Sequence, residues 1–385
     1  MRAPATFLLA ALLAPTASSQ SNAATRRELP AAATAAGAVA LDGSPYVYYV
    51  APGAEKEKFV IYQKGGGWCG SDAECAARSL TELGSSNATF FPAVIDYSTF
   101  AASDGFKLLF ANASINPLAW NWTRIFLPYL DGASQTGDLD APVNVPLPGG
   151  GGSARTIYYR GKRIHDATVA ALLANEGLAG ATDVLYSGGS AGGLAVYLHA
   201  DAWAEAVPNA KFAAVPDSGF FLAYNATPGV GFGAELRWIF ARMNATGGVP
   251  SACIADPAFA DDPAACMFAE NAAATLRAPV FAQQSTYDTW QIDNILHKKD
   301  AAAINAYGAL LSARLRARLL KPHADAAVFL DSCAHHVGEW DEIVIDGATV
   351  HEALGEFYAS IGRGGKREWA QGRAYPCAAC CSGGQ

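Results

Sequence analysis

Short apolar runs alternate with amphipathic stretches along most of the chain. The apolar runs that predict buried strands lie at 58–62, 125–130, 184–187, 212–215, 279–284 and 327–330. Apolar positions recur at helical spacing at 162–175, from 191 to about 206, at 300–320 and at 349–361. Strands that alternate with helices predict an α/β fold, in which a mostly parallel central sheet carries helices on both faces.

Other segments carry weaker patterns. Residues 39–41 and 46–50 predict a hairpin, because the turn signal Asp42-Gly43 lies between them. Residues 156–161 predict a short strand, and the proline- and glycine-rich stretch 142–152 predicts a surface loop. The run 327–330 is expected to be the last strand.

Composition limits the class of protein. The chain has 385 residues, of which 51% are hydrophobic, so it is long enough to bury a large core. We expect a single domain over residues 25–385. The net charge is −8 and no long basic run occurs, which argues against a nucleic acid or an anionic membrane as partner.

The first residues have the pattern of a secretory signal. Arg2 is followed by the apolar stretch 7–14 and by the small residues 16–19, so we expect residues 1–24 to be a cleaved leader rather than a buried helix. No later apolar run is long enough to span a bilayer. The mature chain is therefore predicted to be exported, with no integral membrane segment.

Cysteine usage agrees with export. The eight cysteines form an even set, which in an oxidising compartment predicts disulfides, with Cys253–Cys266 as the most natural local bridge. The cysteines at 377–381 have no histidine beside them, so a metal site is not expected. Five glycosylation sequons fit the same route. They begin at Asn87, Asn112, Asn121, Asn225 and Asn244.

Residues 184–197 hold the most informative motif. An apolar run leads into Gly188-Gly189-Ser190-Ala191-Gly192, and an amphipathic run follows at once. Glycine and serine are common in this chain, so the Gly-x-Ser-x-Gly pattern alone is weak. The strand–turn–helix context favours a nucleophile elbow, in which Ser190 lies at a strained turn.

Glycines also follow the strand predicted at 58–62. Gly65-Gly66-Gly67-Trp68 could turn backbone N–H groups toward a ligand, as an oxyanion hole requires. A flexible turn would explain this segment alone equally well.

A nucleophilic serine needs a histidine base, and that base needs a carboxylate to orient it. In α/β-hydrolases the order along the chain is serine, acid, histidine. Asp288 follows the strand predicted at 279–284, although it could also cap a helix, and Asp331 is the reserve acid. His335 and His336 both follow the last predicted strand, and spacing does not choose between them.

Several motifs together resemble the pectin acetylesterase family, which also contains the Notum carboxylesterases. They are Gly65–Cys69, Asp131–Ser134 with Gly137-Asp138, Ser187–Gly193, Tyr287–Gln291 and Ser332–His336. The family places a cysteine three residues before its catalytic histidine, and Cys333 has that offset from His336. Two positions depart from the plant members and bear on substrate preference, namely Gly189 in place of cysteine and Lys64 in place of an acidic residue.

The resemblance implies an α/β-hydrolase fold and a secreted serine carboxylesterase without a cofactor. Ser190 would be the nucleophile, His336 the base and Asp288 the acid, with an oxyanion hole formed by the N–H groups of Gly67, Trp68 and Ala191. Acetyl esters of a cell-wall polysaccharide such as pectin are the expected substrate. Two alternatives remain, a Notum-like enzyme that removes a longer acyl chain from a protein or lipid, and a secreted binding protein without activity.

Overall fold

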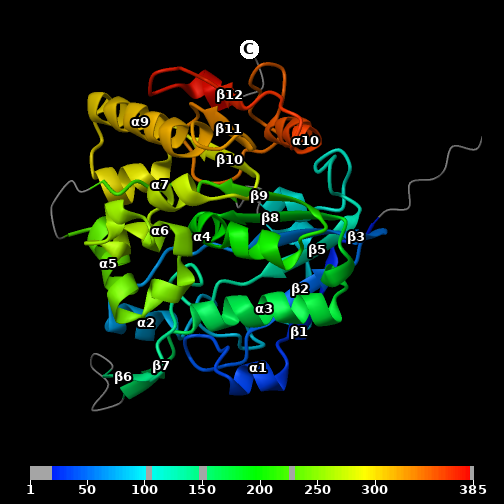
Figure 1. Cartoon of the computed structure of the whole chain (residues 1–385), viewed down its shortest axis with the longest axis vertical. Coiled ribbons are helices and arrows are strands. Elements are labelled where there is room, and N and C mark those ends of the chain that lie inside the picture. The colour runs from blue at the N-terminus through cyan, green and yellow to red at the C-terminus, as the bar shows by residue number, and fades with distance from the viewer. Residues whose placement is uncertain (1–19, 101–105, 147–153, 225–229, 382–385) are drawn as a thin grey trace, which may run out of the picture.

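The computed structural model describes residues 20–100, 106–146, 154–224 and 230–381. A ten-stranded sheet of order β12-β11-β10-β9-β8-β3-β5-β2-β1-β4 runs through the molecule (Figure 1). Its strands are β1 (Ala23–Glu28), β2 (Val47–Ala51), β3 (Glu55–Gln63), β4 (Val94–Asp96), β5 (Trp122–Leu127), β8 (Asp183–Gly189), β9 (Lys211–Asp217), β10 (Val280–Ser285), β11 (Ala326–Asp331) and β12 (Glu368–Ala370).

Helices connect and cover these strands. They are α1 (Ala31–Ala35), α2 (Asp72–Arg78), α3 (Gly161–Asn175), α4 (Ala191–Ala206), α5 (Phe232–Arg242), α6 (Ser251–Ile254), α7 (Ala269–Ala272), α8 (Thr289–Gln291), α9 (Ala301–Leu315) and α10 (Val350–Ser360). The helices expected at 162–175, 191–206, 300–320 and 349–361 correspond to α3, α4, α9 and α10.

The predicted mostly parallel sheet is confirmed. Neighbouring strands are parallel from β5 through β3, β8, β9, β10 and β11 to β12, whereas β2, β1 and β4 are added antiparallel. Because parallel strands end at one edge, the loops after β3, β8, β10 and β11 gather there.

Helices lie on both faces of the sheet. Tyr186 of β8 contacts Trp203 of α4, with ring centroids 5.2 Å apart. The strand register places Tyr186 on the same face as Val280 of β10. The next residue, Phe281, therefore points to the opposite face, where its ring lies 5.7 Å from that of Phe357 in α10.

Several weaker expectations were wrong. The hairpin at 39–50 is only an isolated bridge, Val39 to Pro45, because β2 pairs with β1 and β5 instead. The loop predicted at 142–152 contains β6 (Val143–Pro146), which pairs with β7 (Ala154–Ile157) in a separate two-stranded sheet. The run 327–330 is not the last strand, since β12 follows β11.

The expected leader falls mostly outside the described residues. Ala23 and Ala24 already belong to β1, and the two residues before this strand also make hydrogen bonds. The Ser21 carbonyl accepts a hydrogen bond from Arg124 Nη2 at 2.9 Å, and Asn22 Oδ1 accepts one from the Ala111 N–H at 2.7 Å. In the described ranges, no helix has both the length and the apolar character that crossing a membrane requires.

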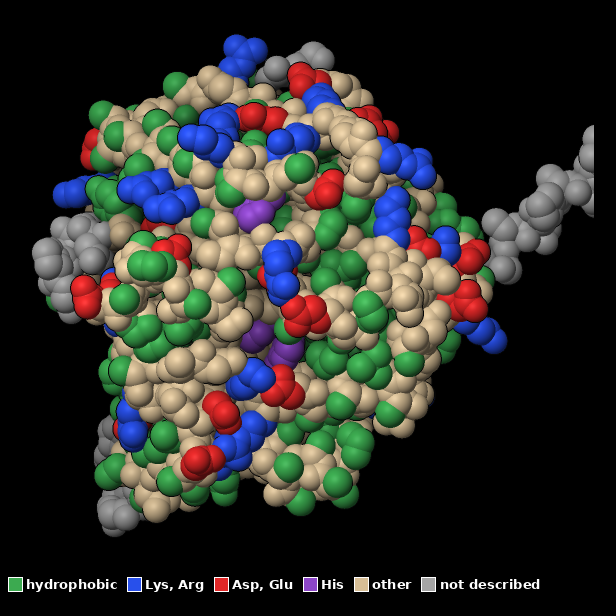
Figure 2. All heavy atoms as spheres, in the orientation of Figure 1, with side chains coloured by type: hydrophobic (Ala, Val, Ile, Leu, Met, Phe, Trp, Pro, Cys, Tyr) green, Lys and Arg blue, Asp and Glu red, His purple; other side chains and the backbone are tan. Residues whose placement is uncertain are grey.

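All eight cysteines form disulfides. The bridges are Cys69–Cys75, Cys253–Cys266, Cys333–Cys381 and Cys377–Cys380. Cys253–Cys266 is the bridge that spacing predicted. On the face shown in Figure 2, acidic and basic side chains are interspersed rather than gathered by sign.

Candidate active site

Ser190 occupies the turn between β8 and α4. Its backbone has φ 58° and ψ −126°, a conformation that residues with a side chain rarely adopt. The turn is held because the Ser190 N–H donates to the Asp217 carbonyl at 2.9 Å. A Cβ at Gly192 would lie 2.2 Å from the Gln63 carbonyl oxygen, so only glycine allows α4 to pack this closely on β3. These features are those of a nucleophile elbow.

His336 and Asp288 reach Ser190 from the loops after β11 and β10. His336 Nε2 lies 2.9 Å from Ser190 Oγ, and its Nδ1 lies 3.0 Å from both carboxylate oxygens of Asp288. A carboxylate only accepts, so Nδ1–H donates to Asp288, which leaves Nε2 to accept the serine proton. The structure thus brings the three residues into the hydrogen-bonded order that proton removal from serine requires.

Asp288 is itself held in place. Its side chain is buried and accepts hydrogen bonds from the Gln291 N–H at 3.0 Å and from Gln284 Nε2 at 3.1 Å. The first of these caps the N-terminus of α8. The helix-capping contact and the contact with His336 occur together, because one carboxylate makes both.

The neighbouring His335 forms a second pair with Asp331. Its Nε2 lies 3.1 Å from Asp331 Oδ2, and its Nδ1 lies 3.2 Å from the Val337 carbonyl oxygen. Burial alone would lower the pKa of His335, but the Asp331 carboxylate outweighs it and raises that pKa to about 9. Asp331 therefore neutralises a buried imidazolium, and it does not contact His336 as a reserve acid would.

The histidine loop, residues 332–340, is also anchored to Asp217 and Ser218. Ser218 Oγ accepts from the Val337 N–H at 2.9 Å. Asp217 Oδ2 accepts from the Gly338 N–H at 3.1 Å and from Trp340 Nε1 at 2.8 Å, while burial raises the pKa of this aspartate. The carbonyl of Asp217 holds Ser190, so this one residue fixes the nucleophile turn and the histidine loop together.

The glycine loop, residues 65–70, lies against the elbow. A Cβ at Gly65 would be 2.9 Å from Ser190 Cβ and 3.2 Å from the Ala191 nitrogen. Within the described ranges, no hydrogen bond takes up the N–H groups of Gly67, Trp68 or Ala191. These N–H groups are therefore available as hydrogen-bond donors.

Two residues that sequence reasoning missed hold this loop. Arg78 in α2 donates to the carbonyls of Gly66 and Trp68, at 2.8 and 2.7 Å. Ser134 Oγ accepts from Trp68 Nε1 at 2.9 Å and donates to the Ala191 carbonyl at 2.8 Å, so it joins the loop to α4. Ser134 lies in one of the quoted motifs, whereas a single arginine in a short helix gives no sequence signal.

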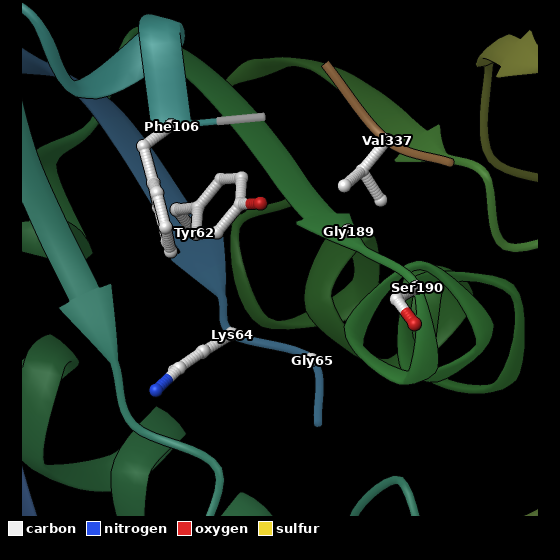
Figure 3. Close-up of a pocket in the computed structure, with 7 residues that line it drawn as sticks. All are labelled: Tyr62, Lys64, Gly65, Phe106, Gly189, Ser190 and Val337. Atoms are coloured by element: carbon white, nitrogen blue, oxygen red, sulfur yellow. The ribbon is translucent and has the colours of Figure 1, made fainter. Parts of the chain in front are cut away.

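A small pocket opens at Ser190 (Figure 3). Its volume is about 180 Å³, below the roughly 300–1,000 Å³ of sites for larger ligands. The rings of Tyr62 and Phe106 form one wall, with centroids 5.0 Å apart, and Val337 lies opposite. The Lys64 side chain points away from Ser190 in Figure 3. The pocket suits a short acyl group.

Comparisons with known proteins point to one family. The family profile described as Pectinacetylesterase matches residues 18–382. Pectin acetylesterase 5 of Arabidopsis thaliana is 28% identical over 86% of this chain and 79% of its own length. Pectin acetylesterase 11 of the same plant is 33% identical over 69% of this chain and 62% of its own length. The solved structure of the Wnt deacylase Notum from Drosophila has a TM-score of 0.73 at 21% identity, covering 93% of this chain and 99% of that one.

Proposed function

The chain belongs to the pectinacetylesterase family and is a carboxylic ester hydrolase, and from this premise we propose that it removes acetyl groups from a cell-wall polysaccharide such as pectin. Ser190 Oγ attacks the ester carbonyl carbon while His336 Nε2 takes the hydroxyl proton. Asp288 orients the imidazole and stabilises the imidazolium. The N–H groups of Gly67, Trp68 and Ala191 stabilise the negative oxygen of the tetrahedral intermediate.

The collapse of that intermediate completes acylation. The alkoxide of the sugar leaves with the proton that His336 took, and an acetyl-Ser190 ester remains. His336 then removes a proton from water, whose oxygen attacks the acetyl carbonyl. Loss of the serine oxygen, reprotonated by His336, releases acetate and restores the enzyme. Acyl transfer by these groups needs no metal or cofactor.

The observation that carries this proposal is the contact of 2.9 Å between His336 and Ser190 beside a pocket of about 180 Å³. A cavity of roughly 150 Å³ holds a benzene-sized group, so an acetyl group fits, whereas a long alkyl chain needs more apolar volume. Acetyl esters are therefore favoured over the long-chain deacylation that a Notum-like enzyme would perform.

Hydrolysis of p-nitrophenyl esters of increasing chain length, run beside acetylated pectin and acetylated xylan, tests the proposal. We expect the efficiency to be highest for acetate, to fall with chain length, and to disappear in Ser190→Ala. A preference for long chains would instead favour the Notum-like alternative. Equal rates of hydrolysis for wild type and Ser190→Ala would overturn the esterase proposal and leave the alternative of a binding protein.

We also propose that the chain is secreted, with its leader within residues 1–24. The contacts of Ser21 with Arg124 and of Asn22 with Ala111 favour cleavage before Ser21, because cleavage after Ser21 removes the first contact and cleavage after Asn22 removes both. Intact-mass measurement of the protein secreted from a eukaryotic host, after removal of glycans, tests this. A mature chain that begins at Asn22 or later would contradict cleavage before Ser21.

A further inference from the structure

A second hollow lies beside the candidate active site and is larger than the pocket at Ser190. It is an open cleft of about 560 Å³ between α2, α5 and the segment after β10. Its walls include Gly70, Glu74, Glu235, Trp238 and Trp290. None of these residues takes part in the acyl-transfer steps.

Two features of the structure place the cleft next to the site. The glycine loop begins at Gly65, which lines the pocket of Ser190, and ends at Gly70, which lines the cleft. In addition, the ring of Trp290 lies 6.1 Å from that of His336 and 5.6 Å from that of Trp68. The cleft is therefore near enough for a large substrate with its acyl group at Ser190 to contact it.

Aromatic and carboxyl groups share this surface. Trp238 and Trp290 line the cleft and are partly exposed, and a tryptophan ring is suited to pack against the apolar C–H face of a sugar. Glu74 accepts from the Gly70 N–H at 2.8 Å, whereas no hydrogen bond among the described residues takes up the carboxyl group of Glu235. Such a group is suited to bind sugar hydroxyls.

We propose that this cleft binds the polysaccharide main chain of the substrate, with sugar rings stacked on Trp238 and Trp290 and a hydroxyl group bound by Glu235. This inference rests on the polysaccharide esterase proposed above and adds the location of the chain. An alkyl chain is a poor occupant, because the cleft is open to water and carries two acidic side chains.

The charge of Glu235 also fits a sugar polymer. Burial, and next the carboxylate of Glu74, raise the pKa of Glu235 to about 7, although Arg78 acts in the opposite direction. Below this pH the protonated group both donates and accepts hydrogen bonds, and it does not repel an acidic sugar.

The test compares activity on the polymer with activity on a small ester. Wild type, Trp238→Ala and Glu235→Gln are assayed for acetate release from acetylated pectin and for p-nitrophenyl acetate hydrolysis. We expect the KM for pectin to rise about tenfold in Trp238→Ala and severalfold in Glu235→Gln, and the ratio of polymer to small-ester efficiency to fall accordingly. Trp120→Ala is the control. This partly exposed tryptophan lies just before β5, where the parallel strands begin, whereas the site lies where they end.

Each outcome is decisive. If the Trp238→Ala protein does not fold, the Glu235→Gln variant, which keeps the side-chain shape, still gives the ratio. Suppose that the wild type is active on pectin and the folded variants keep its ratio of polymer to small-ester efficiency. This result would overturn the proposed role of the cleft and leave the proposed function standing. Wild-type activity on p-nitrophenyl acetate but on no acetylated polysaccharide would overturn both.

Discussion

Two histidine–aspartate pairs stand side by side at the ends of β10 and β11, and they differ in what surrounds them. His336 has 16% of its side chain exposed and reaches Ser190, whereas His335 has 8% exposed and turns toward Asp331. Each histidine contacts its aspartate at 3.0 or 3.1 Å. The same two residue types thus give a histidine in contact with a serine hydroxyl in one pair and a buried ion pair in the other, according to what lies on the far side of the ring.

The second nitrogen of each ring decides its role. Nε2 of His336 meets a hydroxyl group, which can give up a proton. Nδ1 of His335 meets the carbonyl of Val337, which only accepts, so both nitrogens of His335 are donors and the ring is charged. A base must be free to gain a proton, and His335 already holds one.

The largest expected effect is on kcat, and it distinguishes Asp288 from Asp331. We expect Asp288→Asn to reduce kcat about 10⁴-fold, because an amide no longer fixes the histidine tautomer. Asp331→Asn should reduce it far less, and p-nitrophenyl acetate assays of folded protein measure both. Equal losses in the two variants would mean that the pairs act as one unit.

The next effect appears in stability. We expect Asp331→Asn to lower the free energy of unfolding by about 3 kcal/mol, because it leaves the charge of His335 buried without its partner. Urea unfolding measures this, with Asp261→Asn as a control on an exposed aspartate. A loss no larger than that of the control would show that the pair contributes little.

The pH dependence of stability sharpens the comparison further. The pKa of His335 is about 9 in the folded protein, above the roughly 6.5 of an unfolded chain. Its stabilising contribution is therefore complete below pH 6.5 and is lost as the pH rises through 9. We expect the difference in unfolding free energy between wild type and His335→Gln to shrink over this range. A constant difference would contradict a charged His335.

The smallest effect concerns the anchor of the loop. Ser218→Ala removes the acceptor of the Val337 N–H and should cost about 1 kcal/mol of stability. The freer loop should also lower kcat severalfold without a change in KM, which steady-state kinetics with p-nitrophenyl acetate would measure. An unaltered kcat would mean that the contacts of His335 and Asp217 suffice to hold His336.

The core of the fold was predictable because its signals are local. The run at 184–187, the glycines after it and the amphipathic helix together specify β8, the elbow and α4. Strand β1 was not predicted, since Arg26 and Arg27 interrupt its pattern and only Ala24 of the strand is buried. Strands β4 and β12 are three residues long, too short to show a period, and depend on their neighbours in the sheet.

The candidate site residues could be predicted from the sequence, but the residues that hold them in place could not. Motifs and strand ends indicated Ser190 and Asp288, but the choice of His336 over His335 needed the family resemblance. The role of Asp217 depends on contacts between segments far apart in the sequence, and that of Arg78 on contacts with two carbonyl groups of the glycine loop. Such contacts leave no periodic pattern, so only the folded chain reveals them.

The bond between Cys333 and Cys381 makes the order of synthesis matter. Cys381 leaves the ribosome well after His336, so the covalent tether beside this histidine closes only after the segment that holds the histidine has been made. A chain halted before Cys381, or one kept in a thiol-rich cytosol, would lack this covalent tether and would hold the histidine loop only through noncovalent contacts such as its hydrogen bonds to Asp217 and Ser218. The full set of restraints on His336 is thereby coupled to the synthesis of Cys381 and to oxidation.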